Sequence, residues 1–185
     1  MSMTSFHFLI RDGLEKDINA CLALDHSYHT ENVWQMSVKQ DGGQWEVMFK
    51  TERLPRSLEI DYPADEKRLQ ASLPADQCFV VAVGRDDPEI LGYLAMHHDR
   101  ASGIALVQDV VVSRRFRRQH IGSRLMGIAR QWAQEHDARQ LMLQTQTKNY
   151  PGIQFAQVIG LTFCGFNDQY FENQDIAVFF GVPLR

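Results

Sequence analysis

The spacing of apolar residues changes from that of a strand to that of a helix near residue 112. Residues 109–112, Asp-Val-Val-Val, form a β-branched run typical of a strand buried in a sheet. Beyond a polar stretch, apolar residues recur at helical spacing from Ile121 to Ala133. We therefore predict a strand that ends at Val112, a polar turn, and an amphipathic helix whose first residues lie near Ile121.

Before this segment, alternation and turn residues predict a strand, a helix and a hairpin. Asp12 and Glu15 have the spacing of a capping box, which predicts a helix ending near Asp25. Gly42-Gly43 marks the turn of a β-hairpin. The predicted elements are a strand at 6–10, a hairpin at 33–51, and a loop at 53–74 with one short helix at 64–71.

The remaining patterns predict a mixed sheet. Three antiparallel strands lead into the central helix, and a strand at 141–145 follows it, parallel to residues 110–112 by the right-handed crossover rule. Pro151 suits the first turn of a short helix and Gly160 its C-terminal end. The further strands are expected at 78–83, 90–96, 104–112, 161–166 and 175–182. Without repeats or linkers, the chain is predicted to be a single α+β domain over residues 1–185.

Composition narrows the class of protein. The chain has 185 residues, 44% of them apolar and 23% charged, as in ordinary globular domains. No apolar run approaches the roughly 20 residues that span a bilayer, and the N-terminus lacks the features of a secretory signal. Cys21, Cys78 and Cys164 are odd in number and far apart, which favours reduced thiols. We expect a cytoplasmic protein with no membrane partner.

Charge is distributed unevenly along the chain. The net charge is −4, yet residues 113–124 carry five arginines and no acidic residue. A basic segment within an acidic chain suits an anionic cofactor beside a cationic second substrate. Nucleic-acid binding usually needs a larger basic surface, so we expect no nucleic-acid partner.

The segment from Arg117 to Ser123 places backbone N–H groups at the predicted helix start. These groups and the positive end of the helix dipole favour a phosphate or pyrophosphate, and Gly122 permits close approach of a ligand. An arginine-rich turn before an amphipathic helix can equally be a solvated surface.

This stretch resembles the acyl-CoA-binding motif of the GNAT superfamily of N-acyltransferases, a strand followed by Arg/Gln-x-x-Gly-x-Gly/Ala at a helix start. The six positions here are Arg117, Arg118, Gln119, His120, Ile121 and Gly122. His120 stands at the first glycine, where a non-glycine residue is tolerable if its backbone angles are ordinary. Residues 104–146 and the segment Ile176–Phe180 resemble the streptothricin-acetyltransferase branch more narrowly.

The resemblance implies a three-layer α/β-type arrangement, with helices on both faces of a mostly antiparallel sheet. That sheet would splay between its fourth and fifth strands, here 104–112 and 141–145. Acetyl-CoA would lie in the opening as co-substrate, its pyrophosphate on residues 117–123. The backbones of Val110 and Val112 would bind the pantetheine, and the N–H near Val111 would polarise the thioester. Asn149 would contact the cofactor or serve as an ordinary turn residue.

The same resemblance implies acetyl transfer to a primary amine of a small molecule by direct attack. The positions where many members carry a catalytic carboxylate and tyrosine are Gln144 and Ala156 here, and neither side chain transfers protons usefully. Asp109 could orient the amine or relay its proton, and Tyr170 could protonate the thiolate. Tyr28 and Trp34, with Gln144 and Trp45, could line the acceptor pocket, although aromatic packing on the core explains the aromatic residues equally well.

Other readings remain open from the sequence. The loss of both proton-transfer positions also fits an acyl-CoA-binding regulatory module without turnover. His97 and His98 are adjacent on a strand and would point to opposite faces, so we expect a solvated pair and no metal site. The apolar strand at Ile176–Phe180 would suit either a homodimer interface or burial within the domain.

Overall fold

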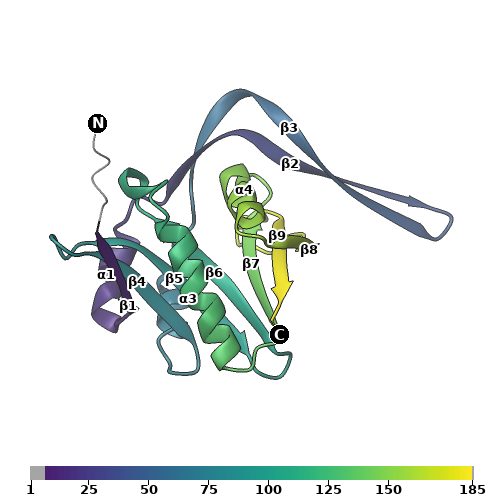
Figure 1. Ribbon diagram of the computed structural model, residues 1–185. Helices are drawn as coiled ribbons and strands as arrows, with labels where there is room; N and C mark the ends of the chain where they lie inside the picture. The colour runs from purple at the N-terminus through teal and green to yellow at the C-terminus, as the bar shows by residue number, and fades with distance from the viewer. Residues whose placement is uncertain (1–6, 185) are drawn as a thin grey trace. The chain divides into compact units, whose positions relative to one another are not determined.

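The computed structural model describes residues 7–184 and contains a mixed β-sheet with helices (Figure 1). Seven strands are hydrogen-bonded in the order β1-β4-β5-β6-β7-β9-β8, and β2 and β3 form a two-stranded sheet. The predicted α+β class with a mostly antiparallel sheet is confirmed. The strands are β1 Phe8–Asp12, β2 Ser27–Asp41, β3 Gln44–Asp61, β4 Cys78–Gly84, β5 Ile90–Asp99, β6 Ile104–Val112, β7 Gln140–Gln146, β8 Thr162–Asn167 and β9 Ala177–Pro183. The helices are α1 Ile18–Leu22, α2 Glu66–Ala71, α3 Ile121–Glu135 and α4 Tyr150–Val158, with 3-10 turns at Glu15–Asp17 and Arg114–Phe116.

The described residues form two compact units. The sheet unit comprises the residues up to His26, Tyr62–Gln144 and those from Gly181 onward. The hairpin unit comprises Ser27–Asp61 and Thr145–Phe180. The span of a single domain over residues 1–185 stays a prediction.

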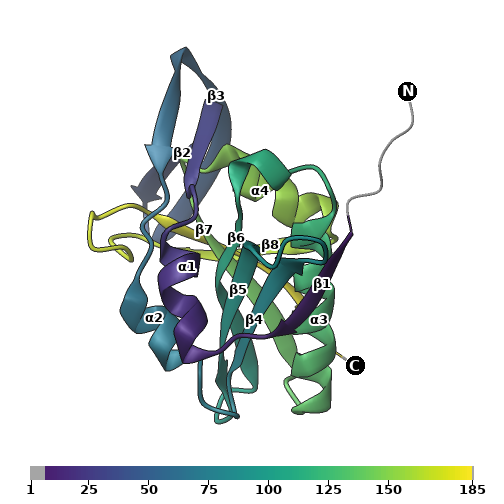
Figure 2. The ribbon, with the colours of Figure 1, turned by 90° about the vertical axis from the view of Figure 1, so that its left-hand side faces the viewer.

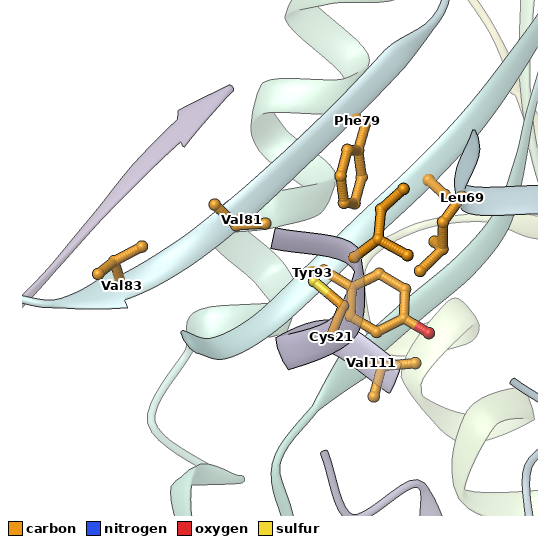
Figure 3. Close-up of a cluster of buried hydrophobic side chains, with 9 residues drawn as sticks. Cys21, Leu69, Phe79, Val81, Val83, Tyr93 and Val111 are labelled. Atoms are coloured by element: carbon orange, nitrogen blue, oxygen red, sulfur yellow. The ribbon is translucent and has the colours of Figure 1, made fainter. Parts of the chain in front are cut away.

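Helices pack on both faces of the strands in the sheet unit, as predicted (Figure 2). Helices α1 and α2 contribute Cys21 and Leu69 to one layer of the core, where they meet Phe79, Tyr93 and Val111 from three successive strands (Figure 3). Successive strand residues point to opposite faces, so the intervening residues of β4 face α3. The alternation explains why β4 is buried throughout although only half of it belongs to this cluster.

Strand β6 leaves its parallel neighbour partway along its length. It pairs with β7 over Ile104–Val107 and Gln140–Leu143, although β6 itself continues to Val112. On its other side, the register with β5 shifts between the pairs formed by Val107 and Asp109, which makes Gln108 a bulged residue. The predicted parallel pairing and the predicted splay between the two strands are confirmed.

The hairpin is longer than the sequence predicts. Strands β2 and β3 pair from Ser27↔Asp61 to Asp41↔Gln44, so the expectation of a loop from residue 53 is wrong as far as Asp61. Pro55 lacks a backbone N–H and suggested a loop. It falls within a shift of register, between the pairs Thr30↔Leu58 and Asn32↔Arg53, where no regular ladder bond is required of it. The turn at Gly42-Gly43 is confirmed, with φ of 52° and 86°.

The predicted start of α1 is wrong because β1 extends through Asp12, which pairs with Val80. Asp12 therefore cannot cap the helix. The N–H of Leu14 instead donates to Oδ2 of Asp17 at 2.9 Å. The helix ends at Leu22, earlier than expected, and the predicted start of β1 at Phe6 lies outside the described residues.

The expected positions of Pro151 and Gly160 at the two ends of the short helix after β7 are confirmed. Pro151 lies in the first turn of α4, and Gly160 follows its last turn with φ of 84°. The three cysteines are free, with Cys21 and Cys78 buried. Between residues 7 and 184, no helix combines the length and the apolar character needed to cross a membrane.

Candidate active site

The turn between β6 and α3 has the backbone shape of an anion site. Arg118 and His120 both adopt left-handed angles, with φ of 63° and 61°, on either side of Gln119. Left-handed residues interspersed in a turn direct successive N–H groups into one concavity, a nest that binds anions. Helix α3 begins directly afterwards at Ile121, so the N–H groups of its first turn add to the same positive end.

His120 does not meet the condition of ordinary backbone angles, under which a non-glycine residue is tolerable at this position of the motif. It is the N-cap of α3 with φ 61° and ψ 9°. A left-handed conformation costs an L-residue about 1–2 kcal/mol, and glycine avoids this cost. This explains in physical terms why a glycine suits the fourth position of the motif. The loop keeps its shape here at the expense of local strain.

Side chains around this turn supply further polar groups. The Oε1 atom of Gln119 is buried without a hydrogen-bond partner among the described residues, so an acceptor has been withdrawn from water without compensation. A pocket of about 330 Å³ lies alongside, lined by Asp25, Ser113, Arg114 and Arg115. The turn and the first residues of α3 could therefore hold a pyrophosphate, and the cofactor site at residues 117–123 stays a prediction.

Arg117 has a structural contact that the sequence did not indicate. Its Nε donates to the carbonyl oxygen of Val112 at 2.9 Å, and burial lowers the pKa of its guanidinium. The carbonyl of Val112, whose backbone was predicted to bind the pantetheine, thus already accepts one bond within the chain, because the chain turns back beside the strand end. A carbonyl oxygen has two lone pairs, so one remains for a ligand. The pairing of β6 with β7 ends at Val107 and Leu143, so β7 does not pair with Val110.

Asp109 lies at the bulge of β6 and is 1% exposed. Arg68 contacts both carboxylate oxygens, with Nε 3.1 Å from Oδ2 and Nη2 3.0 Å from Oδ1. The hydroxyl of Tyr62 lies 2.8 Å from Oδ1 and 2.9 Å from the carbonyl oxygen of Gln108. Since a hydroxyl carries one proton, Tyr62 donates to one of these acceptors at a time. The predicted catalytic carboxylate is thus held in a buried ion pair beside the bulge.

Burial controls the protonation of this cluster. It raises the pKa of Asp109 above the usual carboxyl value, and Arg68 and Tyr62 oppose that shift. Burial also lowers the pKa of His26. A neutral His26 with its proton on Nδ1 donates to the carbonyl of Leu24 at 2.6 Å and accepts from the hydroxyl of Tyr93 at 3.1 Å.

At the two positions that many family members use for proton transfer, this chain has Gln144 and Ala156, whose side chains do not transfer protons. Gln144 is 4% exposed and Ala156 is fully buried. Tyr170 is 37% exposed and lies between β8 and β9, where its ring packs edge-on against Phe171 and Phe179. The catalytic roles of Asp109 and Tyr170 stay predictions.

In the hairpin unit, two predicted pocket residues have contrasting environments. The hydroxyl of Tyr28 donates to Oε1 of Gln146 at 3.1 Å, and burial raises the pKa of that phenol. Trp34 belongs to an aromatic cluster instead, with ring centroids 5.7 Å from Phe49 and 5.8 Å from Phe163. For Trp34 the packing interpretation is supported. Trp45, near the hairpin turn, is 67% exposed.

Asn149 caps the helix that follows β7. Its Oδ1 accepts from the N–H of Gly152 at 2.9 Å. One side-chain acceptor is therefore occupied by the ordinary turn role, while contact with a cofactor stays a prediction.

The sequence missed two groups of polar residues. Tyr62 lay in the segment predicted as a loop and Arg68 in the short helix predicted within it, and both contact Asp109 from more than 40 positions away in sequence. Asp175 binds Gln146 and Lys148, which lie almost 30 positions before it. No local pattern marks such pairs, because their spacing reflects the fold and not the period of a helix or strand.

The histidine pair at the end of β5 differs from expectation. His97 is exposed, whereas His98 is 5% exposed and its ring lies edge-on to Trp132 at 5.8 Å, so the pair is not solvated on both sides. Over residues 7–184, no group of three or more metal-ligating side chains could hold a metal ion.

Known proteins resemble the chain over most of its length. A sequence profile of the acetyltransferase (GNAT) family matches residues 44–161. Streptothricin acetyltransferase from Streptomyces lavendulae is 27% identical over 173 residues, which cover 92% of this chain and 91% of that protein.

Solved structures share the fold. Nourseothricin acetyltransferase superposes with a TM-score of 0.83 at 24% identity, covering 96% of this chain and 99% of that one. A Bacillus anthracis protein assigned as a streptothricin acetyltransferase, in complex with acetyl coenzyme A, gives a TM-score of 0.76 at 20% identity, covering 98% and 100%. Together with the strand order and the nest at the start of α3, the profile match shows that the chain belongs to the acetyltransferase (GNAT) family, as an N-acetyltransferase that uses acetyl-CoA.

Proposed function

We propose that the protein transfers the acetyl group of acetyl-CoA to a primary amine of a small cationic molecule, with a streptothricin-like antibiotic as the acceptor. The observation that carries this proposal is the left-handed backbone at Arg118 and His120, directly before α3. The sequence similarity to a streptothricin acetyltransferase supports the choice of acceptor. A cytoplasmic location remains a prediction from composition.

Residues 117–123 would bind the pyrophosphate through backbone N–H groups, with Arg118 exposed at the rim. The backbone of β6 beyond its bulge would hold the pantetheine, and an N–H near Val111 would stabilise negative charge on the thioester oxygen. The neutral amine attacks the carbonyl carbon directly, a C–N bond forms and the C–S bond breaks. Coenzyme A leaves as a thiolate, which has a pKa near 8.5 and needs no acid to depart.

Asp109 would act in this scheme through its neighbours. Its two oxygens are engaged by Arg68 and Tyr62, and its exposure of 1% leaves little room for direct contact with an amine. We therefore assign Asp109, Tyr62 and Arg68 the role of fixing the bulge at Gln108, and with it the direction of the next N–H groups. Tyr170 would donate a proton to the departing thiolate, and the proton released from the attacking nitrogen would pass to solvent.

Acetyl-CoA binding is tested first by thermal unfolding. A ligand at 100 times its Kd stabilises the folded state by about 2.7 kcal/mol, which corresponds to a rise in Tm of roughly 5–10 °C. Arg118→Ala should reduce this rise without lowering the Tm of the free protein, because its side chain is exposed. Arg130→Ala, exposed on α3, is the matched control and should leave the shift unchanged.

Transfer is tested by the release of coenzyme A thiol with streptothricin as acceptor. Initial rates should show ternary-complex kinetics, because attack is direct. Parallel lines in a double-reciprocal plot would contradict direct attack. Saturable acetyl-CoA binding without thiol release would contradict the proposed acceptor.

A further inference from the structure

Asp175, in the hairpin unit, receives three donors on one carboxylate oxygen. Its Oδ2 lies 2.6 Å from Nε2 of Gln146, 2.8 Å from Nδ2 of Asn173 and 2.7 Å from Nζ of Lys148. Two of these donors are neutral amides and the third is an ammonium ion. The carboxylate is thus held in place by its neighbours and faces a single cation in this cluster.

The amide side of this cluster is rigid. Gln146 is 1% exposed, and its Oε1 accepts from the hydroxyl of Tyr28, which is 5% exposed. An ionised carboxylate only accepts hydrogen bonds, so Asp175 takes Nε2 of Gln146 and leaves Oε1 to the hydroxyl of Tyr28. The two buried residues hold the carboxylate independently of Lys148.

The ammonium side is open. The side chains of Lys148 and Asp175 are 34% and 19% exposed. Exposed ion pairs contribute about 0–1 kcal/mol to stability, and lysine carries a compact charge on a flexible stem. Exchanging Lys148 for another ammonium ion in the same position therefore requires little free energy.

Gln146 lies on the same strand as Gln144, which was predicted to line the acceptor pocket. Gln146 follows Gln144 by two residues, so both side chains leave the strand on the same face. Gln144 occupies the position at which many members of the family carry the carboxylate that acts on the amine. Tyr28 is itself one of the residues predicted to line the acceptor pocket.

We propose that Asp175 binds an ammonium group of the acceptor and that Lys148 is the resident cation which the acceptor displaces. The inference rests on the proposed acetyl transfer. The attacking amine must be neutral, whereas the group bound by Asp175 is charged. The acceptor therefore carries at least two amino groups, one for acetylation and one for recognition.

The binding experiment uses 1,5-diaminopentane, titrated by calorimetry with coenzyme A present, and 1,5-pentanediol as the uncharged comparison. Lys148→Gln removes the competing cation and should bind the diamine up to about fivefold more tightly, the ratio that about 1 kcal/mol represents. Asp175→Asn keeps an acceptor for Gln146 and should bind it at least fivefold more weakly. The diol should not distinguish the variants.

Lys50→Gln is the matched control. Lys50 forms an exposed ion pair with Glu52 at 2.7 Å in the same unit, so its removal changes the net charge equally. It should leave diamine affinity unchanged. If Lys148 only supports the fold, Lys148→Gln should bind the diamine more weakly than the wild type, or neither protein should bind it. Either result overturns the inference.

Steady-state rates with streptothricin separate the inference from the proposed function. Asp175→Asn should raise KM for streptothricin at least fivefold and leave kcat and KM for acetyl-CoA unchanged. A lowered kcat with an altered pH profile would make Asp175 a base and overturn the recognition role. If the wild type does not acetylate streptothricin but the calorimetric pattern appears, the acceptor assignment fails and the ammonium site stands.

Discussion

Each of the two units contains an aspartate paired with a cation. The two pairs differ in the exposure of their side chains and in the type of cation. In the sheet unit, Asp109 is 1% exposed, and the guanidinium of Arg68 contacts both of its carboxylate oxygens. In the hairpin unit, Asp175 meets the single ammonium of Lys148, and both side chains are partly exposed. The buried pair has an arginine, Arg68, whose planar guanidinium can contact both carboxylate oxygens. The partly exposed pair has a lysine, Lys148, which carries a compact charge on a flexible stem.

The difference shows why an ion pair alone does not identify a site. Breaking a buried pair by removing one partner typically costs about 3–5 kcal/mol, whereas an exposed pair contributes about 0–1 kcal/mol. Asp109 is therefore expected to keep its partner throughout catalysis, and Asp175 is free to exchange its own. The first suits a role in shaping the strand, and the second a role in recognition.

The largest effect expected from this comparison is on stability at Asp109. Asp109→Ala would leave Arg68 without its buried counter-charge and should lower the free energy of unfolding by about 3 kcal/mol, and Tm by roughly 6–12 °C. Chemical and thermal unfolding measure both quantities. The double variant Asp109→Leu with Arg68→Met removes both charges and should recover most of the loss. A single variant as stable as the wild type would contradict the buried-pair description.

The dependence of stability on pH should distinguish Asp109, whose pKa is raised, from Asp17, whose pKa is lowered. Arg11 lowers the pKa of Asp17 below its usual 3.8, so stability from Asp17 is present above that value and lost as pH falls through the lowered pKa. Burial raises the pKa of Asp109 above 3.8, so its contribution is greatest below 3.8 and declines as pH rises through the raised pKa.

Unfolding between pH 3 and pH 7 therefore gives opposite trends. The stability of the wild type relative to Asp17→Asn should grow as pH rises, and its stability relative to Asp109→Asn should shrink. Parallel trends for the two variants would show that the Arg68 contact outweighs burial at Asp109.

At the open pair, the effect on stability should be small. Lys148→Gln and Asp175→Asn should each change the free energy of unfolding by less than about 1 kcal/mol, since the pair is partly exposed. Urea unfolding measures this, with Lys50→Gln as the control. A loss of unfolding free energy as large as that of Asp109→Ala would mean that Lys148 stabilises the fold. The two ion pairs would then no longer differ in their contribution to stability.

The smallest effect concerns backbone strain at the cofactor turn. His120→Gly should relieve the left-handed conformation and raise stability by about 0.5–1 kcal/mol after the entropy cost of glycine. Asp137→Gly is the control, because Asp137 has φ of 58° just beyond the last turn of α3. Both should raise Tm, and neither should weaken acetyl-CoA binding. Destabilisation by His120→Gly alone would mean that the imidazole itself supports the turn.

The sequence by itself determined most of the strands and helices and the position of the turn before α3. The periodicity change near residue 112 fixed the end of β6, and the apolar face of α3 fixed the helix, because both signals are local and repeat many times. The arginine-rich turn and Gly122 made residues 117–123 the candidate anion site for the same reason. The parallel placement of β7 followed from the handedness of crossovers.

Tertiary structure decided the conformations and partners at the site. The left-handed angles at Arg118 and His120 follow from the geometry of the turn and not from the preference of either residue, so neither residue type indicated them in the sequence. The extension of the hairpin past Pro55 depended on cross-strand register. The partners of Asp109 and Asp175 are far apart in sequence, and only folding brings a buried charge to the group that compensates it.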